Sequence, residues 1–340
     1  MARADRRRRT LRRNLAFSAI AVVLVLYLTE LGLRLGGVQP AYQADAIGGW
    51  RMLPQTDHQQ MTGREGTSFV LTTNADGLRT TLRPARTPGV PRVALLGDST
   101  TFGWGVNDGE TVADSLAAAL EAQGRHVEVL NGGQPGYTTT QMEQIFHTVV
   151  ARYQPDLTVV FVPMHDDNRV LVSDREHLEG AAGPTAWVRT QLALNSRIYQ
   201  VLRQAIFPLT AEAALVPGRD ASAEVRVPRV SAAERDDNFD RIRSDAKAFH
   251  GTVAIGHLPF LADLLGEVRD ERFSGPWART YSERTGTPIV DLRTCCVDKG
   301  GEALVLPLDH GHLNATGNRL VGEAAAVEIG KLVGGPTPPP

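Results

Sequence analysis

The sequence predicts an α/β protein: a three-layer α/β/α sandwich around a central five-stranded parallel sheet, preceded by one N-terminal transmembrane helix. Two observations predict it. Short apolar runs alternate with segments of helical periodicity, which is the pattern of parallel strands joined by helical crossovers. An uncharged stretch over residues 15–29 follows an arginine-rich start. The length of 340 residues suits one large domain, or one and a half.

The first 37 residues have the pattern of a membrane signal. Residues 15–29 carry no charge, and the apolar stretch continues past Glu30 and Arg34. This brings it to about 20 residues, the length of a membrane-spanning helix. The small-x-small motif at residues 44–46 lies too far downstream for signal cleavage. We therefore predict an uncleaved signal anchor over residues 15–37, with a cleaved signal peptide and a buried core helix as the alternatives.

Charge is distributed unevenly along the chain. Of its 36 basic and 38 acidic residues, eight arginines lie within the first 35 positions. The positive-inside rule places the basic tip, residues 1–14, in the cytoplasm. We therefore expect a single-pass protein of the bacterial inner membrane whose main part is periplasmic or extracellular. That main part is acidic, which argues against nucleic acid as a partner.

The remaining composition is that of a globular protein. Hydrophobic residues make up 42% and charged residues 22%, which excludes a mostly disordered chain and a multi-span membrane protein. The only two cysteines, Cys295 and Cys296, are adjacent. Neighbours in sequence rarely pair, because the bond would strain the peptide between them. We expect two buried small hydrophobic residues, with a strained disulfide or an intermolecular one as alternatives.

The elements of the sandwich begin at residue 92, after an extended lead-in over residues 38–91 that is rich in Gly, Pro, Thr and Gln. Residues 92–96, RVALL, suit a strand buried on both faces. Residues 110–123 have apolar side chains at helical spacing and end before Gly124, a typical helix stop. The pattern then predicts a strand at 126–130, a helix at 141–153 and a strand at 156–162.

A long interruption follows the third predicted strand. Residues 169–250 exceed an ordinary connection, and they contain two predicted helices, at 186–206 and 232–249. We expect this helical insertion to cover the site as a cap or to be a peripheral decoration. The sandwich, bounded at 92–334, resumes with strands at 251–258 and 287–292 and helices at 277–285 and 314–333, before a disordered tail at 335–340.

Ser99 stands immediately after the first predicted strand, in the tripeptide Gly97-Asp98-Ser99. The carboxyl end of a parallel strand, before a helix, is where α/β proteins place reactive groups. The N–H groups at the start of that helix favour negative charge that develops there. A bare G-D-S tripeptide also occurs often in turns, so Ser99 alone is weak evidence for a nucleophile.

Asp309 and His312 lie three residues apart, just before the last predicted helix. A serine nucleophile needs a base within hydrogen-bond reach, and the base needs an orienting group. His312 is suited to take the Ser99 proton, and Asp309 to fix the imidazole and stabilise its charged form. A solvated loop that caps the last helix is the alternative, and the two roles can coexist.

Together these motifs resemble the SGNH hydrolase family, also called GDSL esterases and lipases, over about residues 70–332 apart from the insertion. The first block of the family matches residues 97–99, the second matches residues 131–137, and the last matches Asp309-x-x-His312. The resemblance implies a catalytic triad of Ser99, His312 and Asp309. It also implies that the backbone N–H groups of Ser99 and Gly136 hold the oxyanion. Residues 74–79 and 95–106 are similar to a membrane-anchored subgroup.

The third block departs from the family pattern. The family has Gly-x-Asn-Asp after the third strand, and its Asn side chain donates to the oxyanion, whereas this chain reads PMHDDN from residue 163. Direct alignment places His165 at the Asn position and Asp166 at the Asp position. The His165 N–H can donate to an oxyanion, and Asn168 is the alternative donor. A loop histidine satisfied by a neighbouring aspartate is the remaining interpretation.

The resemblance implies a serine ester hydrolase or an O-acyltransferase. The expected substrates are acyl esters of envelope or exported glycans, or lipid esters, and no cofactor is needed. We predict no metal site, because Asp166 and Asp167 have no second cluster of ligands in the sequence. A catalytically weak envelope protein that binds acylated polysaccharide is the alternative, motivated by the altered third block.

Overall fold

The chain forms two compact units, Met1–Ala44 with Ala182–Ser222, and Asp45–Ala181 with Ala223–Pro340. The structure is a computed structural model. It describes residues 2–36, 42–45, 49–63, 67–179, 195–202, 226–267, 275–307 and 311–333, together with positions 185, 188, 191, 192 and 309.

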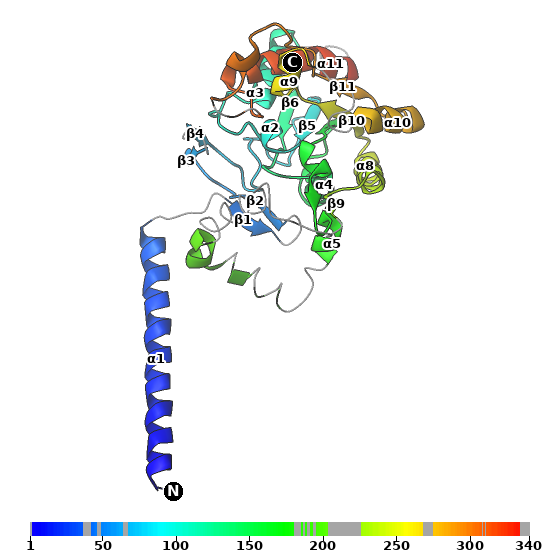
Figure 1. Ribbon diagram of the computed structural model, residues 1–340. Helices are drawn as coiled ribbons and strands as arrows, with labels where there is room; N and C mark the ends of the chain where they lie inside the picture. Colours follow the sequence, from blue (N-terminus) through cyan, green and yellow to red (C-terminus); the bar gives the residue numbers. More distant parts are fainter. Residues whose placement is uncertain are drawn as a thin grey trace. The chain divides into compact units, whose positions relative to one another are not determined.

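The first unit contains a long N-terminal helix, α1 (Ala2–Leu35), drawn in blue in Figure 1. Its residues 13–35 are long and apolar enough to cross a membrane, and the unit does not bury them. This length and composition fit a membrane span or a signal sequence equally. The helix predicted at 186–206 belongs to the same unit and lies only partly within the described residues.

The second unit is built on a five-stranded parallel sheet in the order β11-β10-β7-β5-β6. In β5, which lies between β6 and the central strand β7, Leu95 is paired with Asn131 of β6 and with Val159 of β7. The carboxyl ends of these strands therefore meet at one edge. The predicted parallel sheet is confirmed, with strands at β5 (Arg92–Leu96), β6 (Glu128–Asn131), β7 (Leu157–Phe161), β10 (Thr252–His257) and β11 (Ile289–Asp291).

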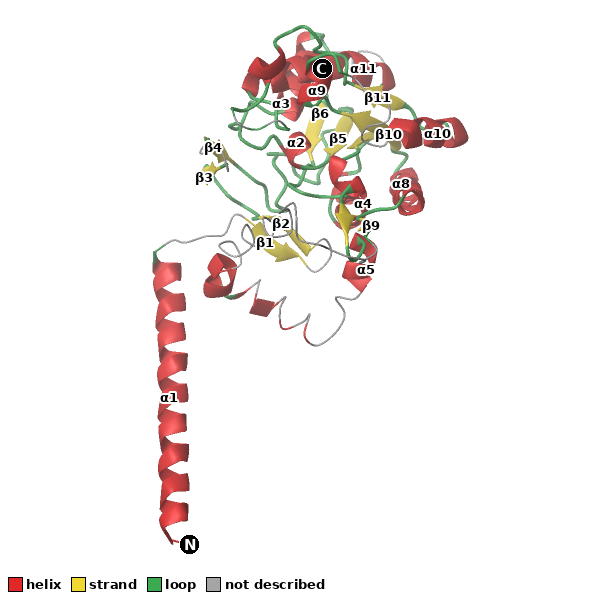
Figure 2. Cartoon of the chain, viewed as in Figure 1, coloured by secondary structure: helices red, strands yellow, loops and turns green. Residues whose placement is uncertain are grey.

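Helices cover both faces of this sheet, as Figure 2 shows in red around the yellow strands. One apolar core lies under α3 (Val112–Ala122) and α11 (Ala315–Leu332), which pack against each other. A second core lies on the other face under α4 (Thr139–Thr148), α8 (Ala232–Lys247) and α10 (Gly275–Thr285). The predicted α/β/α sandwich is thus confirmed.

Local sequence signals explain where the main helices begin. Thr111 and Ser231 form capping boxes at the starts of α3 and α8, and the Asn314 side chain accepts the Gly317 N–H at the start of α11. Such caps satisfy backbone N–H groups that the first helical turn leaves free. Asn314 therefore takes the capping role that its position before the last helix predicts.

Smaller elements complete the described part of the second unit. The lead-in of this unit holds β2 (Gly49–Met52) and an antiparallel hairpin of β3 (Gln59–Thr62) and β4 (Ser68–Leu71). The preceding strand β1 (Tyr42–Asp45) belongs to the first unit except for its last residue. Within 169–250, the pair β8 (Arg169–Val170) and β9 (Val227–Pro228) and the helix α5 (Asp174–Glu179) are formed. The helix α8 packs on α4 as a layer of the sandwich. The tail at 335–340 lies outside the described residues.

The two cysteines lie in the turn after β11, and both are free thiols. Cys296 is fully buried in the core beside α11, and Cys295 is partly exposed. Their sulfur atoms are 2.8 Å apart. Burial of Cys296 agrees with the expected small hydrophobic residue, while Cys295 remains within reach of solvent.

Candidate active site

Ser99 lies at the carboxyl end of strand β5, as the first residue of the short helix α2 (Ser99–Phe102). The Asp98 side chain caps this helix by accepting from the Thr100 N–H at 2.9 Å and the Thr100 hydroxyl at 2.7 Å. A Cβ at Gly97 would lie 1.9 Å from the Thr101 hydroxyl oxygen. Gly97 therefore allows the sharp strand-to-helix turn that presents Ser99, and Asp98 stabilises this turn.

The loop before α11 brings His312 and Asp309 to this turn. The His312 Nε2 is 2.7 Å from the Ser99 Oγ, and its Nδ1 is 2.5 Å from the Asp309 Oδ2. The second carboxylate oxygen of Asp309 accepts the backbone N–H groups of Gly311 and His312. The structure thus brings together residues that are 213 positions apart in the sequence, in a continuous chain of hydrogen bonds.

The Asp309 carboxylate is held in its charged form. Burial raises the pKa of Asp309, but the hydrogen bond to His312 and those from the backbone outweigh burial, so the pKa lies below its ordinary value. A charged carboxylate accepts the Nδ1–H of the imidazole and leaves Nε2 unprotonated toward Ser99. This arrangement can take a proton from a hydroxyl and hold the resulting positive charge.

The loop after β6 packs directly against the Ser99 turn. The Gln134 N–H donates to the Gly97 carbonyl at 3.0 Å, and a Cβ at Gly133 would lie 2.3 Å from the Phe102 nitrogen. Gly136 follows with a φ of +77°, a left-handed conformation that glycine adopts without strain. The glycines of this motif therefore permit both the close approach and the turn at Gly136.

His165 also lies beside the Ser99 turn. It belongs to a 3-10 helix, η2 (Met164–Asp167), that follows β7. Its Nε2 is 3.6 Å from the Asp98 Oδ2. Asn168 is exposed, and its Nδ2 is 3.4 Å from the His165 Nδ1. Of the two candidate donors, His165 is therefore the one in contact with the Ser99 turn, while Asn168 lies behind the imidazole.

Comparison with known protein families identifies the family of the chain. A model of the GDSL-like lipase/acylhydrolase family matches residues 95–320, which contain the Ser99 turn, the Gly136 loop and the His312 loop. The chain belongs to this family. The resemblance to SGNH hydrolases is thereby confirmed, and the protein is a carboxylic ester hydrolase of the SGNH type.

Three solved structures are similar to this chain at low sequence identity. A lipase/acylhydrolase from Enterococcus faecalis is 17% identical (TM-score 0.45, covering 74% of this chain and 100% of that one). A putative lipolytic protein of the G-D-S-L family from Desulfitobacterium hafniense is 16% identical (TM-score 0.41, 69% and 98%). The esterase EstA from Pseudoalteromonas is 12% identical (TM-score 0.44, 71% and 97%). No curated protein matches the chain.

A buried ion pair, which sequence reasoning missed, supports the third block of this GDSL-like hydrolase. Asp166 is fully buried and accepts the Arg235 Nε–H at 2.8 Å, together with the N–H and hydroxyl of Thr139. Thr139 opens α4, directly after the Gly136 loop, and Arg235 lies in α8. Arg235 gives no sequence signal except that it shares a helix face with the buried Phe239 and Ile242.

Burial raises the pKa of Asp166, although Arg235 and Thr139 act in the opposite direction. Desolvation therefore outweighs the attraction to Arg235, as is common for buried ion pairs. The pair's evident structural role is to tie η2, and with it His165, to the start of α4. It joins the third block of the hydrolase to its second.

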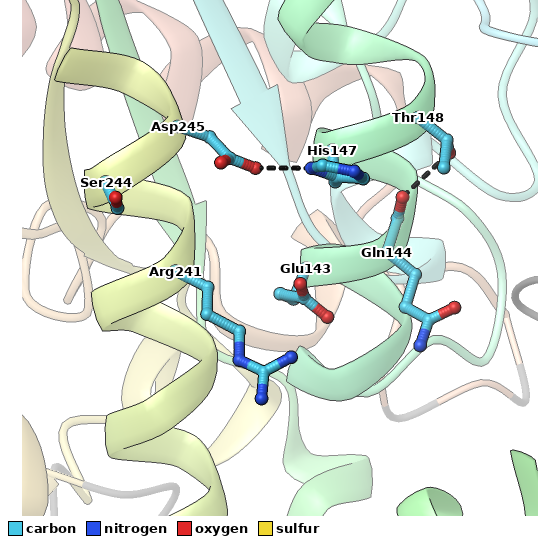
Figure 3. A pocket seen from close by; sticks show the side chains of 7 residues that line it. All are labelled: Glu143, Gln144, His147, Thr148, Arg241, Ser244 and Asp245. Carbon is cyan, nitrogen blue, oxygen red and sulfur yellow. Dashed lines mark hydrogen bonds and ion pairs between the residues drawn. The ribbon is translucent and has the colours of Figure 1, made fainter. Parts of the chain in front are cut away.

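A hollow of about 430 Å³ lies between α4 and α8, and no residue of the triad lines it. Figure 3 shows Arg241 of α8 reaching toward Glu143 of α4, with the His147–Asp245 pair at the other end. Burial raises the pKa of Glu143, and Arg241 and His147 partly oppose this. Among the described residues, no group of three or more His, Cys, Asp or Glu side chains is arranged to hold a metal ion.

Proposed function

We propose that this hydrolase acts through a Ser99–His312–Asp309 triad on acyl esters of envelope or exported glycans, or on lipid esters. The observation that carries the proposal is the hydrogen-bond chain from the Ser99 hydroxyl through the His312 ring to the Asp309 carboxylate. A serine with this base and this orienting group is an activated nucleophile. Membership of the GDSL-like family supplies the ester class of the substrate.

In the first half of the reaction, the Ser99 Oγ attacks the acyl carbonyl carbon while His312 Nε2 takes the hydroxyl proton. The carbonyl oxygen becomes an oxyanion, which accepts hydrogen bonds from the backbone N–H groups of Ser99 and Gly136. His165 supplies a third donor from its ring. His312 then gives its proton to the leaving alcohol, and an acyl-Ser99 ester remains.

In the second half, His312 Nε2 takes a proton from an acceptor hydroxyl, which attacks the acyl-Ser99 carbonyl. Water as the acceptor gives hydrolysis, and a sugar hydroxyl gives acyl transfer. Ser99 leaves with the proton from His312, which restores the enzyme. The same residues serve both outcomes, so the acceptor that reaches the acyl-enzyme decides between esterase and O-acyltransferase.

The proposed location is the bacterial inner membrane, with α1 as an uncleaved single-pass anchor. The apolar span at residues 13–35 and the arginines in front of it support this placement. The positive-inside rule then puts the triad on the periplasmic or extracellular side. Acyl esters on envelope glycans and lipids are the esters available there.

Two measurements test this proposal. The full-length chain, purified in detergent, is assayed with p-nitrophenyl acetate, butyrate and octanoate beside its Ser99→Ala variant. Turnover that requires Ser99 is expected, and the trend with chain length ranks short acyl groups against lipid-like ones. An added acceptor oligosaccharide that gains an acyl group identifies a transferase. Turnover that survives Ser99→Ala would contradict the triad.

A further inference from the structure

Glu30 of α1 is bonded to a segment more than 160 residues further along the chain. Its carboxylate accepts the backbone N–H groups of Arg197 at 2.9 Å and Ile198 at 3.1 Å, and the Ser196 hydroxyl at 3.2 Å. One turn further along α1, Arg34 donates to Glu30 and to the Asn195 carbonyl oxygen. All five contacts lie within the first unit of the chain.

The contact satisfies polar groups on both sides. Residues 197–202 are helical, and the first N–H groups of a helix have no partner within it. A carboxylate placed at these groups is favourable both as a hydrogen-bond acceptor and through the helix dipole. Glu30 thus caps the helical turn at 197–202 and holds it beside α1, and the Glu30 side chain is left only 20% exposed.

Glu30 lies within the apolar part of α1, not beyond its end. The exposed side chain of Leu28 precedes it along the helix, and the exposed side chains of Leu31 and Leu35 follow it. At 1.5 Å per residue, Glu30 is about 7–8 Å below the end of the helix at Leu35. In a membrane, an ionisable residue at such a depth needs partners that satisfy it. Residues 195–198 supply them and therefore lie at the same depth.

The described part of the segment that Glu30 holds has large apolar side chains that are exposed. The exposed fractions are 49% for Val188, 44% for Leu192, 37% for Val201 and 53% for Leu202. Apolar side chains gathered in one exposed segment mark a contact surface. A helical segment that presents such side chains at the level of the lipid headgroups lies in the membrane interface.

We propose that the described residues between 188 and 202 form a lipid-contacting surface, which Glu30 and Arg34 hold at the outer end of the anchor helix. The ligand is a phospholipid bilayer, with Leu192, Val201 and Leu202 entering the boundary between headgroups and acyl chains. This inference rests on the proposed anchoring of α1 in the membrane. It gives this part of the insertion the role of a membrane-surface element.

The test places a nitroxide probe at Leu202→Cys, in the full-length chain with Cys295→Ser and Cys296→Ser. The protein is reconstituted into vesicles of phosphatidylethanolamine and phosphatidylglycerol. Collision rates are measured with oxygen, which partitions into lipid, and with a water-soluble nickel chelate. The matched control is Val327→Cys on α11, since Val327 and Leu202 have the same exposed fraction, 53%. Both labels are measured again with Glu30→Ala and Glu30→Gln.

The proposal expects a higher oxygen-to-nickel ratio at residue 202 than at residue 327. This excess should be lost in Glu30→Ala and partly kept in Glu30→Gln, which retains one acceptor oxygen. Equal ratios at the two positions, in protein that stays with the vesicles after an alkaline wash, would overturn the lipid contact alone. A label shielded from both reagents would overturn it in favour of a protein partner. A chain that the wash releases would overturn the anchor as well.

Discussion

The buried pair of Asp166 and Arg235 gives the sharpest stability prediction. Asp166→Ala removes a carboxylate that is fully buried and leaves the Arg235 side chain, itself only 4% exposed, without its closest partner. The second contact of Arg235, to Asp167 at 3.0 Å, joins it to a side chain that is 54% exposed. Breaking a buried ion pair from one side costs roughly 3–5 kcal/mol.

Asp167→Ala is the matched control, because it removes a neighbouring carboxylate from the same guanidinium. An exposed ion pair is worth about 0.2–1 kcal/mol. With about 2–4 °C per kcal/mol for a unit of this size, Asp166→Ala should lower the Tm by about 6–20 °C and Asp167→Ala by less than about 4 °C. Thermal unfolding of the full-length chain in detergent, followed by tryptophan fluorescence, measures both.

The same variants separate a structural role from a catalytic one. Asp166 ties η2 to the start of α4, so its loss should also lower kcat at temperatures where the protein is still folded, because His165 loses its support. Asp167→Ala should leave kcat unchanged. Equal Tm shifts in the two variants would refute the reasoning, since burial would then not decide the cost of losing the carboxylate.

Three further predictions concern the site and the hollow beside it. Gly136→Ala should lower kcat and cost about 1–2 kcal/mol, because alanine is strained at a φ of +77°. Gly109→Ala, at +85° in open space, should cost as much in thermal unfolding but spare kcat. Because the pKa of Asp309 is lowered in the folded state, its charged carboxylate stabilises the fold at any pH above its unfolded pKa of about 3.9. This stabilisation is lost only as the pH falls through the lower folded pKa. The Asp309 carboxylate should therefore stay charged down to a pH below its ordinary pKa, and Asp309→Asn should remove most activity at every pH. Glu143→Gln should raise the Tm at pH 7 but not at pH 4. The reason is that burial raises the folded pKa of Glu143, so the penalty for its charge develops as the pH rises above the unfolded pKa of about 4.3 and is complete above the folded pKa.

The sequence predicts the sandwich well because its signals are local. Residues 92–96 form β5 as predicted, and the other strands differ from their predicted bounds by one or two residues. The helix predicted at 141–153 ends earlier, at Thr148, and a 3-10 turn follows it at Val150–Tyr153. Strand and helix periodicity depend on neighbours in the chain, which the sequence displays directly.

Long-range polar contacts are what the sequence does not display. Arg92 is the first residue of β5, and the rest of this strand is apolar. Its guanidinium is nevertheless buried, and it is paired with Glu128 of the next strand. Arg235 meets Asp166, and Glu30 meets residues 196–198, only after the chain has folded. Each contact joins a pair that no spacing rule connects, so periodicity and motif length carry no signal for it.

The candidate site could be predicted from the sequence only in part. The order of its motifs, together with the family resemblance, led to Ser99, Asp309 and His312 as candidates, and the structure brings the three within hydrogen-bond distance. Alignment left His165 and Asn168 open as oxyanion donors. The geometry favours His165, because its ring contacts Asp98 beside Ser99 while Asn168 lies behind it.

The central claim is that Ser99 is the nucleophile, and trapping of the acyl-enzyme tests it most directly. The full-length chain is mixed with p-nitrophenyl acetate and quenched in acid within the first turnover, and the modified peptide is found by mass spectrometry. The account predicts an acetyl group on Ser99, together with a burst of p-nitrophenol that Ser99→Ala and His312→Ala abolish. Acetyl on another residue, with a burst that persists in Ser99→Ala, would contradict it.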